Sequence, residues 1–359
     1  MNNKLRFIQI GLGGFGKVWC QNIIPQITDY TQLVAAVDVN VETHKNAVEF
    51  CGLPLEKCYT SLRKALEENK ADFITIVIPP AFHEEAVDIA IEFGCDIVCE
   101  KPYGDSIESS CRIYKKVKRA GRKMIITMSH RFAQDKQTLE AMIKSDKYGE
   151  LNYIYSRLAM MRHRLKFQQR GNGHNLGAAG MISEATIHQL DIIRAMSGSN
   201  AKTVYAQVWS PEWHKDSSHS IADSCYIMIE MENGVHAVCE QSFVNATILN
   251  EWGRDYIRAE CKNATLELDN HEIQVRSHLG FPFEELSKIK NIEKEKSEWT
   301  HLALLRLFAN WVNDGTEPLC SIEDNLQCAA LTYAAIESTV TGKAVDVQEY
   351  LRFWINKIQ

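Results

Sequence analysis

The first third of the chain alternates short β-branched runs with amphipathic segments, a pattern typical of βαβ units and a parallel sheet. The apolar runs predict strands at Leu5–Ile10, Leu33–Val39, Phe73–Ile78, Asp96–Cys99 and Lys123–Met128. The segments between them predict helices at Phe15–Ile24, Glu42–Phe50, Ser61–Glu68, Ala81–Phe93 and Ser106–Ala120, three of which stop at Pro25, Gly94 and Gly121. We therefore expect residues 1–127 to form a doubly wound α/β domain.

The pattern changes from about Ser129 onward, where longer alternating segments replace the βα units. A hairpin is predicted from Cys225–Met231 and Val235–Phe243, because Asn233-Gly234 between them tolerates positive φ in a tight turn. Residues 128–359 are expected to form an α+β domain with a large, mostly antiparallel open sheet. It should also contain helices near 134–144, 302–313 and 322–340, and a solvated loop over the charged stretch 284–298.

Composition narrows the class of protein. The 359 residues are 45% hydrophobic and 24% charged, which suits two cored domains. A net charge of -6 disfavours a nucleic-acid partner, and no apolar run reaches the ~20 residues of a membrane span. Eleven cysteines without paired CxxC spacing, and a start without a secretory leader, predict reduced thiols and a cytoplasmic protein.

A glycine motif follows the first predicted strand. Gly11-Leu12-Gly13-Gly14-Phe15-Gly16 matches G-x-G-x-x-G where a strand turns into a helix, the arrangement that admits a pyrophosphate in Rossmann domains. Asp38 ends the next strand, 22 residues after Gly16, where a carboxylate can accept hydrogen bonds from ribose hydroxyls. The same charge repels a 2′-phosphate, so NAD is expected rather than NADP, with FAD left open by the glycines alone.

Other candidate contacts end the remaining strands, because ligands of open α/β sheets bind beyond the carboxyl ends of the strands. They are Pro79-Pro80, Glu100-Lys101-Pro102 and Ser129-His130-Arg131. Lys101 is either a surface lysine in a turn or a functional cation beside the cofactor, and the following proline permits a cis peptide bond.

A second constellation lies after the glycine-rich stretch 171–180. Glu184, His188 and Asp191 are spaced i, i+4 and i+7, which places them on one face of a helix. On spacing alone, a solvated polar face explains these three residues better than a functional site does. A metal site is not expected, because no third ligand can be assigned and no HExxH occurs.

With these residues in place, the chain resembles the Gfo/Idh/MocA family of NAD(P)-dependent sugar and cyclitol oxidoreductases. The resemblance spans nearly the whole chain and is most specific in the Glu100-Lys101-Pro102 tripeptide and the His188 helix. It also includes the glycine turn, the proline pair with His83, His130-Arg131-Phe132, the stretch 177–191, and the tail 334–343. It implies cofactor contacts at Gly11, Gly13, Gly14, Phe15, Gly16, Asp38, Pro79, His83, Glu100 and Lys101.

The resemblance further implies that Lys101 reaches the reacting hydroxyl and that His188 accepts its proton, assisted by the acid one turn earlier. Many members have aspartate where this chain has Glu184, so the role of that carboxylate is less secure. Sugar contacts are expected from Lys101, Glu184 and His188, and from polar residues near the glycine-rich stretch, namely Arg162, His163 and His174. Family members commonly form dimers or tetramers through the open sheet, so a homodimer or homotetramer is expected.

These residues favour hydride transfer between a secondary alcohol of a sugar, sugar derivative or cyclitol and a nicotinamide cofactor. Two other hypotheses remain at this stage. A glycosidase or lyase can retain NAD and use transient oxidation, and a regulator can bind NAD and sugar without catalysis. The presence of both Lys101 and His188 argues against the regulator.

Overall fold

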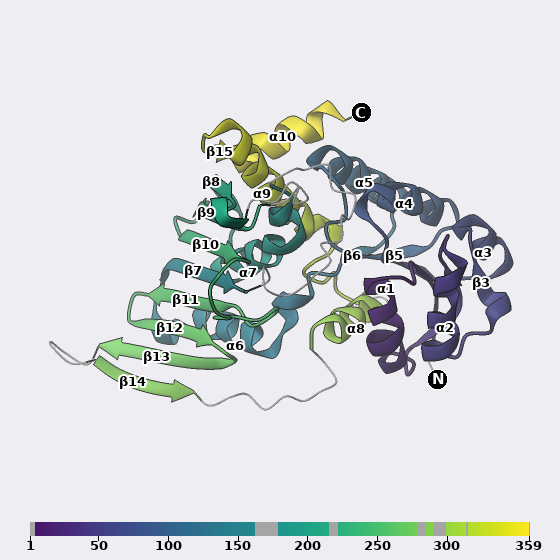
Figure 1. Cartoon of the computed structure of the whole chain (residues 1–359), viewed down its shortest axis with the longest axis horizontal. Helices are drawn as coiled ribbons and strands as arrows, with labels where there is room; N and C mark the ends of the chain where they lie inside the picture. The colour runs from purple at the N-terminus through teal and green to yellow at the C-terminus, as the bar shows by residue number, and fades with distance from the viewer. Residues whose placement is uncertain are drawn as a thin grey trace. The chain divides into compact units, whose positions relative to one another are not determined.

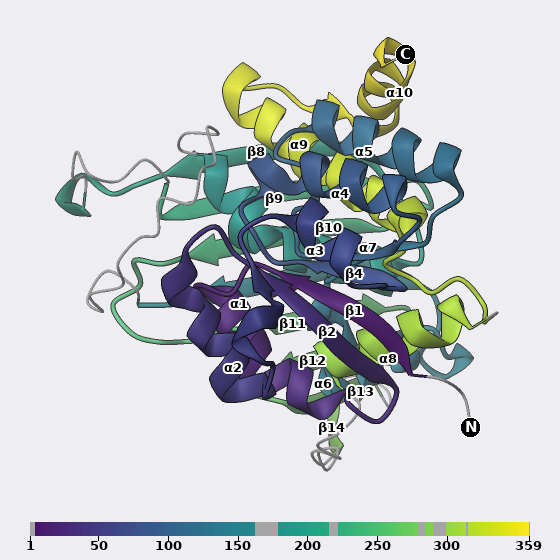
Figure 2. The same cartoon turned by 90° about the vertical axis from the view of Figure 1, so that its right-hand side faces the viewer.

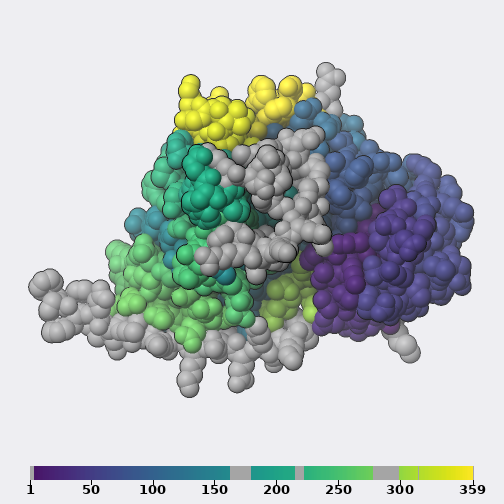
Figure 3. Space-filling model, in the orientation of Figure 1, coloured from purple at the N-terminus to yellow at the C-terminus, as the bar shows by residue number. Residues whose placement is uncertain are grey.

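The computed structural model describes residues 4–161, 179–214, 222–278, 284–289, 299–313 and 315–358. The chain divides into two compact units, which are treated separately below. Unit 1 comprises Met1–Met128, Lys296–Leu326 and Ile358, and unit 2 comprises Ser129–Glu295, Gln327–Lys357 and Gln359. The purple to blue atoms of Figure 3 belong to residues 4–128 of unit 1.

Unit 1 is built on a parallel sheet, sheet A, with six strands in its described residues and the order β3-β2-β1-β4-β5-β6. The strands are β1 (Leu5–Ile10), β2 (Thr31–Val37), β3 (Cys58–Tyr59), β4 (Phe73–Ile76), β5 (Asp96–Cys99) and β6 (Met124–Ile126). All are parallel, and the central β1 and β4 pair in register from Phe7 with Phe73 to Ile10 with Ile76. The crossovers reverse direction between β1 and β4, which creates the switch point where ligands of such sheets bind.

Helices cover both faces of sheet A, as the almost wholly apolar strands require. In Figures 1 and 2, α3 (Leu62–Glu68), α4 (His83–Glu92) and α5 (Ile107–Ala120) lie on one face. The other face carries α1 (Phe15–Val18), α2 (His44–Cys51) and α8 (His301–Val312). The helix that the sequence predicts from Phe15 continues after α1 as one π-helical turn and one 3₁₀ turn that contains Pro25.

The segment 296–326 corrects the predicted domain boundary, because the sequence analysis assigned it to the second domain. Its helix α8 packs on sheet A through Phe308, whose ring lies 5.3 Å from that of Phe73 in β4. Ile126 of β6 also donates a backbone hydrogen bond to Cys320. The two contacts join residues that are 235 and 194 positions apart in the chain, a separation that local spacing cannot reveal.

Unit 2 contains sheet B, whose described strands number nine in the order β14-β13-β12-β11-β7-β10-β9-β8-β15 (Figure 1). Its strands are β7 (Leu151–Ala159), β8 (Ala201–Trp209), β9 (Ser224–Met231), β10 (His236–Ser242), β11 (Tyr256–Cys261), β12 (Ala264–Asp269), β13 (Glu272–His278), β14 (Glu284–Ile289) and β15 (Val345–Asp346). Every pairing is antiparallel except that of β7 with β10, and the predicted hairpin is β9–β10. The predicted mostly antiparallel sheet is therefore confirmed.

The helices of unit 2 are α6 (Gln134–Ile143), α7 (Ile187–Ser197), α9 (Ile322–Thr341, which begins in unit 1) and α10 (Val347–Lys357). Strand β14 corrects the loop predicted for 284–298, since Glu284–Ile289 pairs antiparallel with β13 and the rest lies outside the described residues. Backbone pairing needs no apolar periodicity, so the charged sequence concealed the strand. Among the helices in the described ranges, none has both the length and the apolar character needed to cross a bilayer.

Candidate functional site

The candidate residues fall into two half-sites, one in each unit. The first lies at the carboxyl edge of sheet A and begins with the glycine turn. Gly11 donates a backbone hydrogen bond of 2.8 Å to Val37 and has a φ of +88°. A Cβ on Gly11 would lie 2.1 Å from the Val77 carbonyl oxygen, and a Cβ on Gly16 would lie 2.2 Å from that of Gly11. Gly14 and Phe15 are exposed at the start of α1, so their backbone amides can approach a pyrophosphate.

Gly11→Ala is expected to lower the free energy of unfolding of unit 1 by about 3 kcal/mol or more, through positive-φ strain and steric overlap. Gly52→Ala is the matched control, because Gly52 has a φ of +67° but would place no atom within 4 Å of its new Cβ. The control should lower the free energy of unfolding by about 1 kcal/mol, because it introduces only the positive-φ strain. Urea unfolding curves of both variants measure the difference, and equal losses would show that Val77 does not constrain the turn.

Asp38 follows β2 and binds the glycine turn directly. Its Oδ2 accepts hydrogen bonds from the amides of Leu12 (2.8 Å) and Gly13 (3.2 Å), and its Oδ1 accepts one from Asn40 (2.9 Å). The carboxylate is thus oriented at the edge of the glycine turn, where the sequence predicts the ribose.

Two residues of α2, which the sequence analysis did not select, donate hydrogen bonds to backbone carbonyl groups of the glycine turn and of Asp38. The Nε2 of His44 donates to the carbonyl oxygen of Asp38 (2.9 Å), and the Nδ2 of Asn46 donates to that of Leu12 (2.8 Å). No sequence signal marks them, because a histidine and an asparagine in a short helix fit a solvated face equally well.

Asp38→Ala is expected to reduce the preference for NAD over NADP by about tenfold or more, which corresponds to about 1.4 kcal/mol. The reason is that the carboxylate repels a 2′-phosphate and accepts from a 2′-hydroxyl. Asp38→Asn is the matched control for the turn, since it keeps one acceptor for the Leu12 amide and removes only the charge. Titration of both variants with each dinucleotide measures the ratio, and an unchanged ratio in both would refute the ribose contact.

Glu100 precedes Lys101 at the end of β5, and its carboxylate is buried inside unit 1. Its Oε1 accepts a 3.0 Å hydrogen bond from the indole of Trp19 and lies 3.4 Å from the Nε2 of His301 in α8. Burial acts to raise the pKa of Glu100, but the hydrogen bond and charge of His301 outweigh it, so the pKa lies below its ordinary value. His301 also packs against Phe15 of the glycine turn, at 5.7 Å between ring centroids.

Glu100→Gln is expected to lower the free energy of unfolding at pH 7 by about 1 to 3 kcal/mol, because a charge-assisted buried contact is lost. The folded pKa lies below the ordinary value of a glutamic acid, so this stabilisation is present above that ordinary value and disappears as the pH falls through the folded pKa. The difference from the wild type should therefore shrink in acid. Urea unfolding between pH 3 and 7 measures this difference in the free energy of unfolding. Glu56→Gln, at an exposed position, is the control. A difference that does not change with pH would show that the charge of the Glu100 carboxylate is not the source of the stabilisation.

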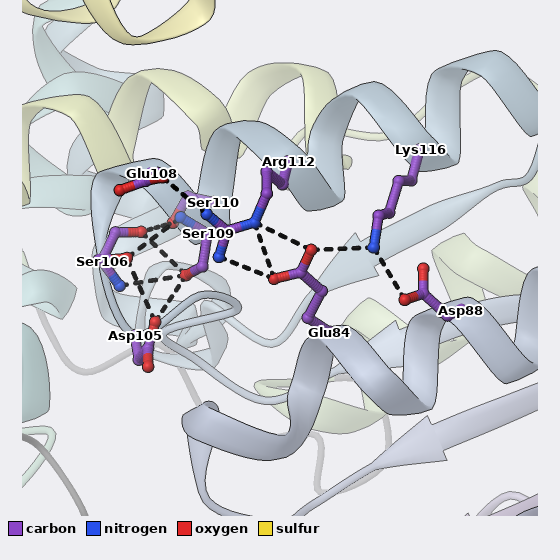
Figure 4. Close-up of polar contacts among 9 residues, drawn as sticks. All are labelled: Glu84, Asp88, Asp105, Ser106, Glu108, Ser109, Ser110, Arg112 and Lys116. Atoms are coloured by element: carbon purple, nitrogen blue, oxygen red, sulfur yellow. Dashed lines mark hydrogen bonds and ion pairs between the residues drawn. The ribbon is translucent and has the colours of Figure 1, made fainter. Parts of the chain in front are cut away.

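Lys101 is half-buried in the loop between β5 and α5, and its peptide bond to Pro102 is cis, as the sequence permits. The loop is held at its far end by Ser106, which caps α5 in a reciprocal pair with Ser109. Figure 4 shows Arg112 of α5 making a forked ion pair with Glu84 of α4, and Lys116 bridging Glu84 and Asp88. These pairs fix α5 against α4, and so fix the loop that carries Lys101.

Pro79 lies in the loop after β4, and His83 is the first residue of α4. Pro79 is exposed, whereas His83 is fully buried and binds backbone. The Nε2 of His83 donates to Ile78 (2.7 Å), and its Nδ1 lies 3.3 Å from both the Tyr103 carbonyl oxygen and the Cys99 sulfur. This geometry gives His83 a role in joining the β4 and β5 loops, and direct contact with a cofactor stays a prediction.

The second half-site lies on α7 of unit 2 and on the π-helical turn Ile182–Thr186 before it. His188 is 5% exposed and Asp191 is 1% exposed, so the alternative of a solvated polar face is wrong for this helix. Two buried hydrogen bonds attach the segment to sheet B, from Gln189 to Ser156 (3.0 Å) and from Thr186 to Gln241 (2.7 Å). Glu184 lies in the π-helical turn, a local geometry that is frequent at functional sites.

Charged and aromatic side chains surround His188 within unit 2. The Asp191 carboxylate lies 3.6 Å from Arg131 and 3.8 Å from Arg194, so its charge is matched locally. The ring of His188 stacks on that of His130, and Trp252 packs edge-on against both. Arg162, His163 and His174, which the sequence selected as sugar contacts, lie outside the described residues.

The two-unit architecture agrees with the comparisons with known proteins. Residues 5–128 match an oxidoreductase family with an NAD-binding Rossmann fold, and residues 137–259 match the GFO/IDH/MocA C-terminal domain. The chain belongs to the Gfo/Idh/MocA family. Its N-terminal unit is thus the NAD-binding Rossmann domain of an oxidoreductase family.

Individual relatives within this family cover most of the chain. The uncharacterized protein y4oX of Sinorhizobium fredii is 36% identical over 355 residues, which are 97% of each chain. Inositol 2-dehydrogenase of Pseudarthrobacter chlorophenolicus is 28% identical over 247 residues, 68% of this chain and 69% of that protein. The structure of an oxidoreductase from Agrobacterium radiobacter in complex with NAD+, L-tartaric acid and magnesium has the same fold, with a TM-score of 0.81 at 21% identity, covering 97% of this chain and 99% of the other.

Proposed function

We propose that this chain is an NAD-dependent dehydrogenase that oxidises a secondary alcohol of a sugar, a sugar derivative or a cyclitol. The observation that carries the proposal is the position of Lys101, which follows β5 at the same edge of sheet A as the glycine turn and Asp38. A cation at the edge where a dinucleotide binds can stabilise a substrate oxygen that gains negative charge. The inositol 2-dehydrogenase relative supports the alcohol class of substrate.

Each residue has a distinct part in the proposed reaction. Bound NAD supplies the acceptor for the hydride that leaves the carbinol carbon. Lys101 stabilises the alkoxide as the hydroxyl loses its proton, and a neutral His188 accepts that proton. Glu184, one turn before His188, assists it.

The glycine turn and Asp38 favour NAD over NADP. The amides of Gly14 and Phe15 can bind the pyrophosphate, while Asp38 can accept from the 2′-hydroxyl of the adenosine ribose. The residues after Asp38 are Val39 and Asn40, so no arginine follows to bind a 2′-phosphate. The same proposal places the protein in the cytoplasm, because a reducing compartment keeps its eleven cysteines as free thiols.

The experiment is a screen of NAD reduction at 340 nm across sugars, sugar acids, glycosides and inositols, with product analysis in parallel. We expect stoichiometric NADH with at least one polyol. Product without net NADH would replace the proposal with an NAD-retaining glycosidase or lyase. Sugar binding with no product in either assay would replace it with a regulator.

We also propose that the chain forms a homodimer or homotetramer through the open face of sheet B. Alternate residues of β8 and β9 on this face are large and exposed, with Trp209 at 40%, Tyr226 at 47% and Met228 at 52%. An apolar and aromatic patch of this kind marks association surfaces more often than it occurs on monomers. Sedimentation equilibrium of the whole chain tests the assembly, and a monomer at micromolar concentration would refute it.

A further inference from the structure

Two cysteines of unit 1 lie in contact, and a third lies near them. Cys20 is in the π-helical turn after α1, Cys51 is the last residue of α2, and Cys58 begins β3. All three are free cysteines, and the Cys51 thiol donates a 3.5 Å hydrogen bond to the Cys20 carbonyl oxygen. The proposed reaction uses none of these thiols.

The contact between Cys20 and Cys51 belongs to an interface between two helical segments. Helix α2 packs against the π-helical turn that contains Cys20, beside α1 in Figures 1 and 2. Residues next to the thiols join the same two segments, because the Lys17 ammonium lies 5.8 Å from the centroid of the Phe50 ring. The two cysteines therefore meet across a packed helical interface rather than across a loop.

The two thiols differ in accessibility and in acidity. Cys51 is partly accessible to solvent, whereas Cys20 is wholly buried. A hydrogen bond from Cys20 lowers the pKa of Cys51 and outweighs the opposing effect of burial. The same hydrogen bond, together with burial and the charges of Cys51 and Cys58, raises the pKa of Cys20. Cys51 is thus the thiol that an oxidant attacks first, and Cys20 is held beside it as its partner.

The same two segments hold the glycine turn. The turn leads directly into α1, and α2 supports it through His44 and Asn46, which donate to the carbonyl oxygens of Asp38 (2.9 Å) and Leu12 (2.8 Å). A disulfide has a specific geometry of its own, so its formation would replace the hydrogen bonds of the thiols and shift the two segments against each other. Such a shift would displace the backbone amides that face a pyrophosphate.

We propose that Cys20 and Cys51 are a peroxide-sensitive dithiol whose closure to a disulfide weakens NAD binding by unit 1. The Cys51 thiolate attacks an oxygen of hydrogen peroxide, the O–O bond breaks, and the products are a sulfenic acid and, with the thiol proton, water. The Cys20 sulfur then attacks the Cys51 sulfur, the S–O bond breaks, and a second water leaves. Each thiol loses one proton and one electron, and the peroxide takes them up.

This proposal uses the NAD-binding Rossmann domain of the family and not the proposed dehydrogenation. Disulfides in reducing compartments are usually transient and redox-sensing, so the dithiol is expected to stay reduced until peroxide appears.

The first test locates the oxidation in the full chain. Reduced protein is treated with a small molar excess of hydrogen peroxide, the remaining thiols are alkylated, and the unreduced digest is mapped by mass spectrometry. We expect a peptide linked through Cys20 and Cys51, a loss of two titratable thiols, and full recovery with dithiothreitol. Cys51→Ala should lose this response, whereas Cys58→Ala, the matched control in the same unit, should keep it. A link to Cys58 instead, or no linked peptide, would overturn the proposal.

The second test is calorimetric titration of the reduced and the oxidised chain with NAD. We expect the Kd to rise by about fivefold or more on oxidation, an ordinary size for coupling between two sites, and to recover on reduction. By linkage, saturating NAD should shift the equilibrium of the dithiol with glutathione toward the thiols by the same factor. A disulfide that leaves both quantities unchanged would overturn the proposal.

Two controls separate this effect from damage elsewhere. Peroxide-treated Cys51→Ala should keep its NAD affinity, which excludes the other thiols as the cause, and Cys51→Ser is the second variant if the alanine variant does not fold. Circular dichroism of the oxidised chain should match that of the reduced chain. A weaker affinity that accompanies unfolding would count against the proposal.

The result is separable from the proposed function, because neither assay needs turnover. A linked peptide and a weaker NAD affinity in a chain that oxidises no polyol refute the function and keep the dithiol. An active dehydrogenase without the linked peptide refutes the dithiol and keeps the function.

Discussion

Lys101→Met is expected to lower turnover by about 100-fold or more while NAD affinity stays within a few-fold, because the ammonium acts on charge that develops only in the transition state. Methionine approximates the length and apolar stem of lysine and removes only the cation. Dinucleotide affinity should change little, since the glycine turn and Asp38 form their contacts without Lys101. Steady-state kinetics with the best substrate of the screen, together with NAD titration, measures both quantities.

Lys64→Met is the matched control, since Lys64 is an exposed lysine of α3 in the same unit, with 66% of its side chain accessible. It should retain full turnover. Undiminished turnover in Lys101→Met would remove this lysine from the mechanism. A loss of NAD binding as large as the loss of turnover would instead place the ammonium on the cofactor.

His188→Asn is expected to lower turnover by about 10²- to 10⁴-fold and to abolish the ascending limb of the pH-rate profile. The sign follows from the role of a base, which accepts a proton only when it is uncharged, so the rate rises as the pH passes its apparent pKa. For an unperturbed histidine that limb is centred near pH 6.5. The profile of kcat/KM from pH 5 to 9 measures it.

His236→Asn tests whether the effect is specific to α7, because His236 is exposed on β10 of the same unit. Its profile should match that of the wild type. An ascending limb that persists in His188→Asn would assign the base to another group, and Glu184→Gln would then be examined for the same limb.

The Rossmann fold of unit 1 was predictable because its elements depend on residues close in sequence. Predicted strands Leu5–Ile10 and Asp96–Cys99 coincide with β1 and β5, and the helix ends at Gly94 and Gly121 were expected from the residue type alone. The two-residue β3 was missed, because so short a strand contains no periodicity.

The candidate site was predictable only in part. Asp38 and Lys101 were selected because they follow predicted strands, and the structure places both after strands of sheet A, whereas their roles stay predictions. For Glu184, His188 and Asp191, spacing alone favoured a solvated face, and only the burial of His188 and Asp191 in α7 excluded that alternative. His301 and Asn46 had no local signal, since each acts by binding a residue distant in sequence, and His44 had none although its partner Asp38 lies only six residues away.

The sequence by itself determined the cofactor class and the two-domain order, and it selected the residues that we propose for proton and charge transfer. These depend on motifs within a few residues, where backbone geometry and side-chain chemistry act directly. Only the tertiary structure decided that α8 completes unit 1, that β7 and β10 pair in parallel, and that His130 stacks on His188. Such contacts join distant residues, and their energies depend on the path of the folded chain rather than on local spacing.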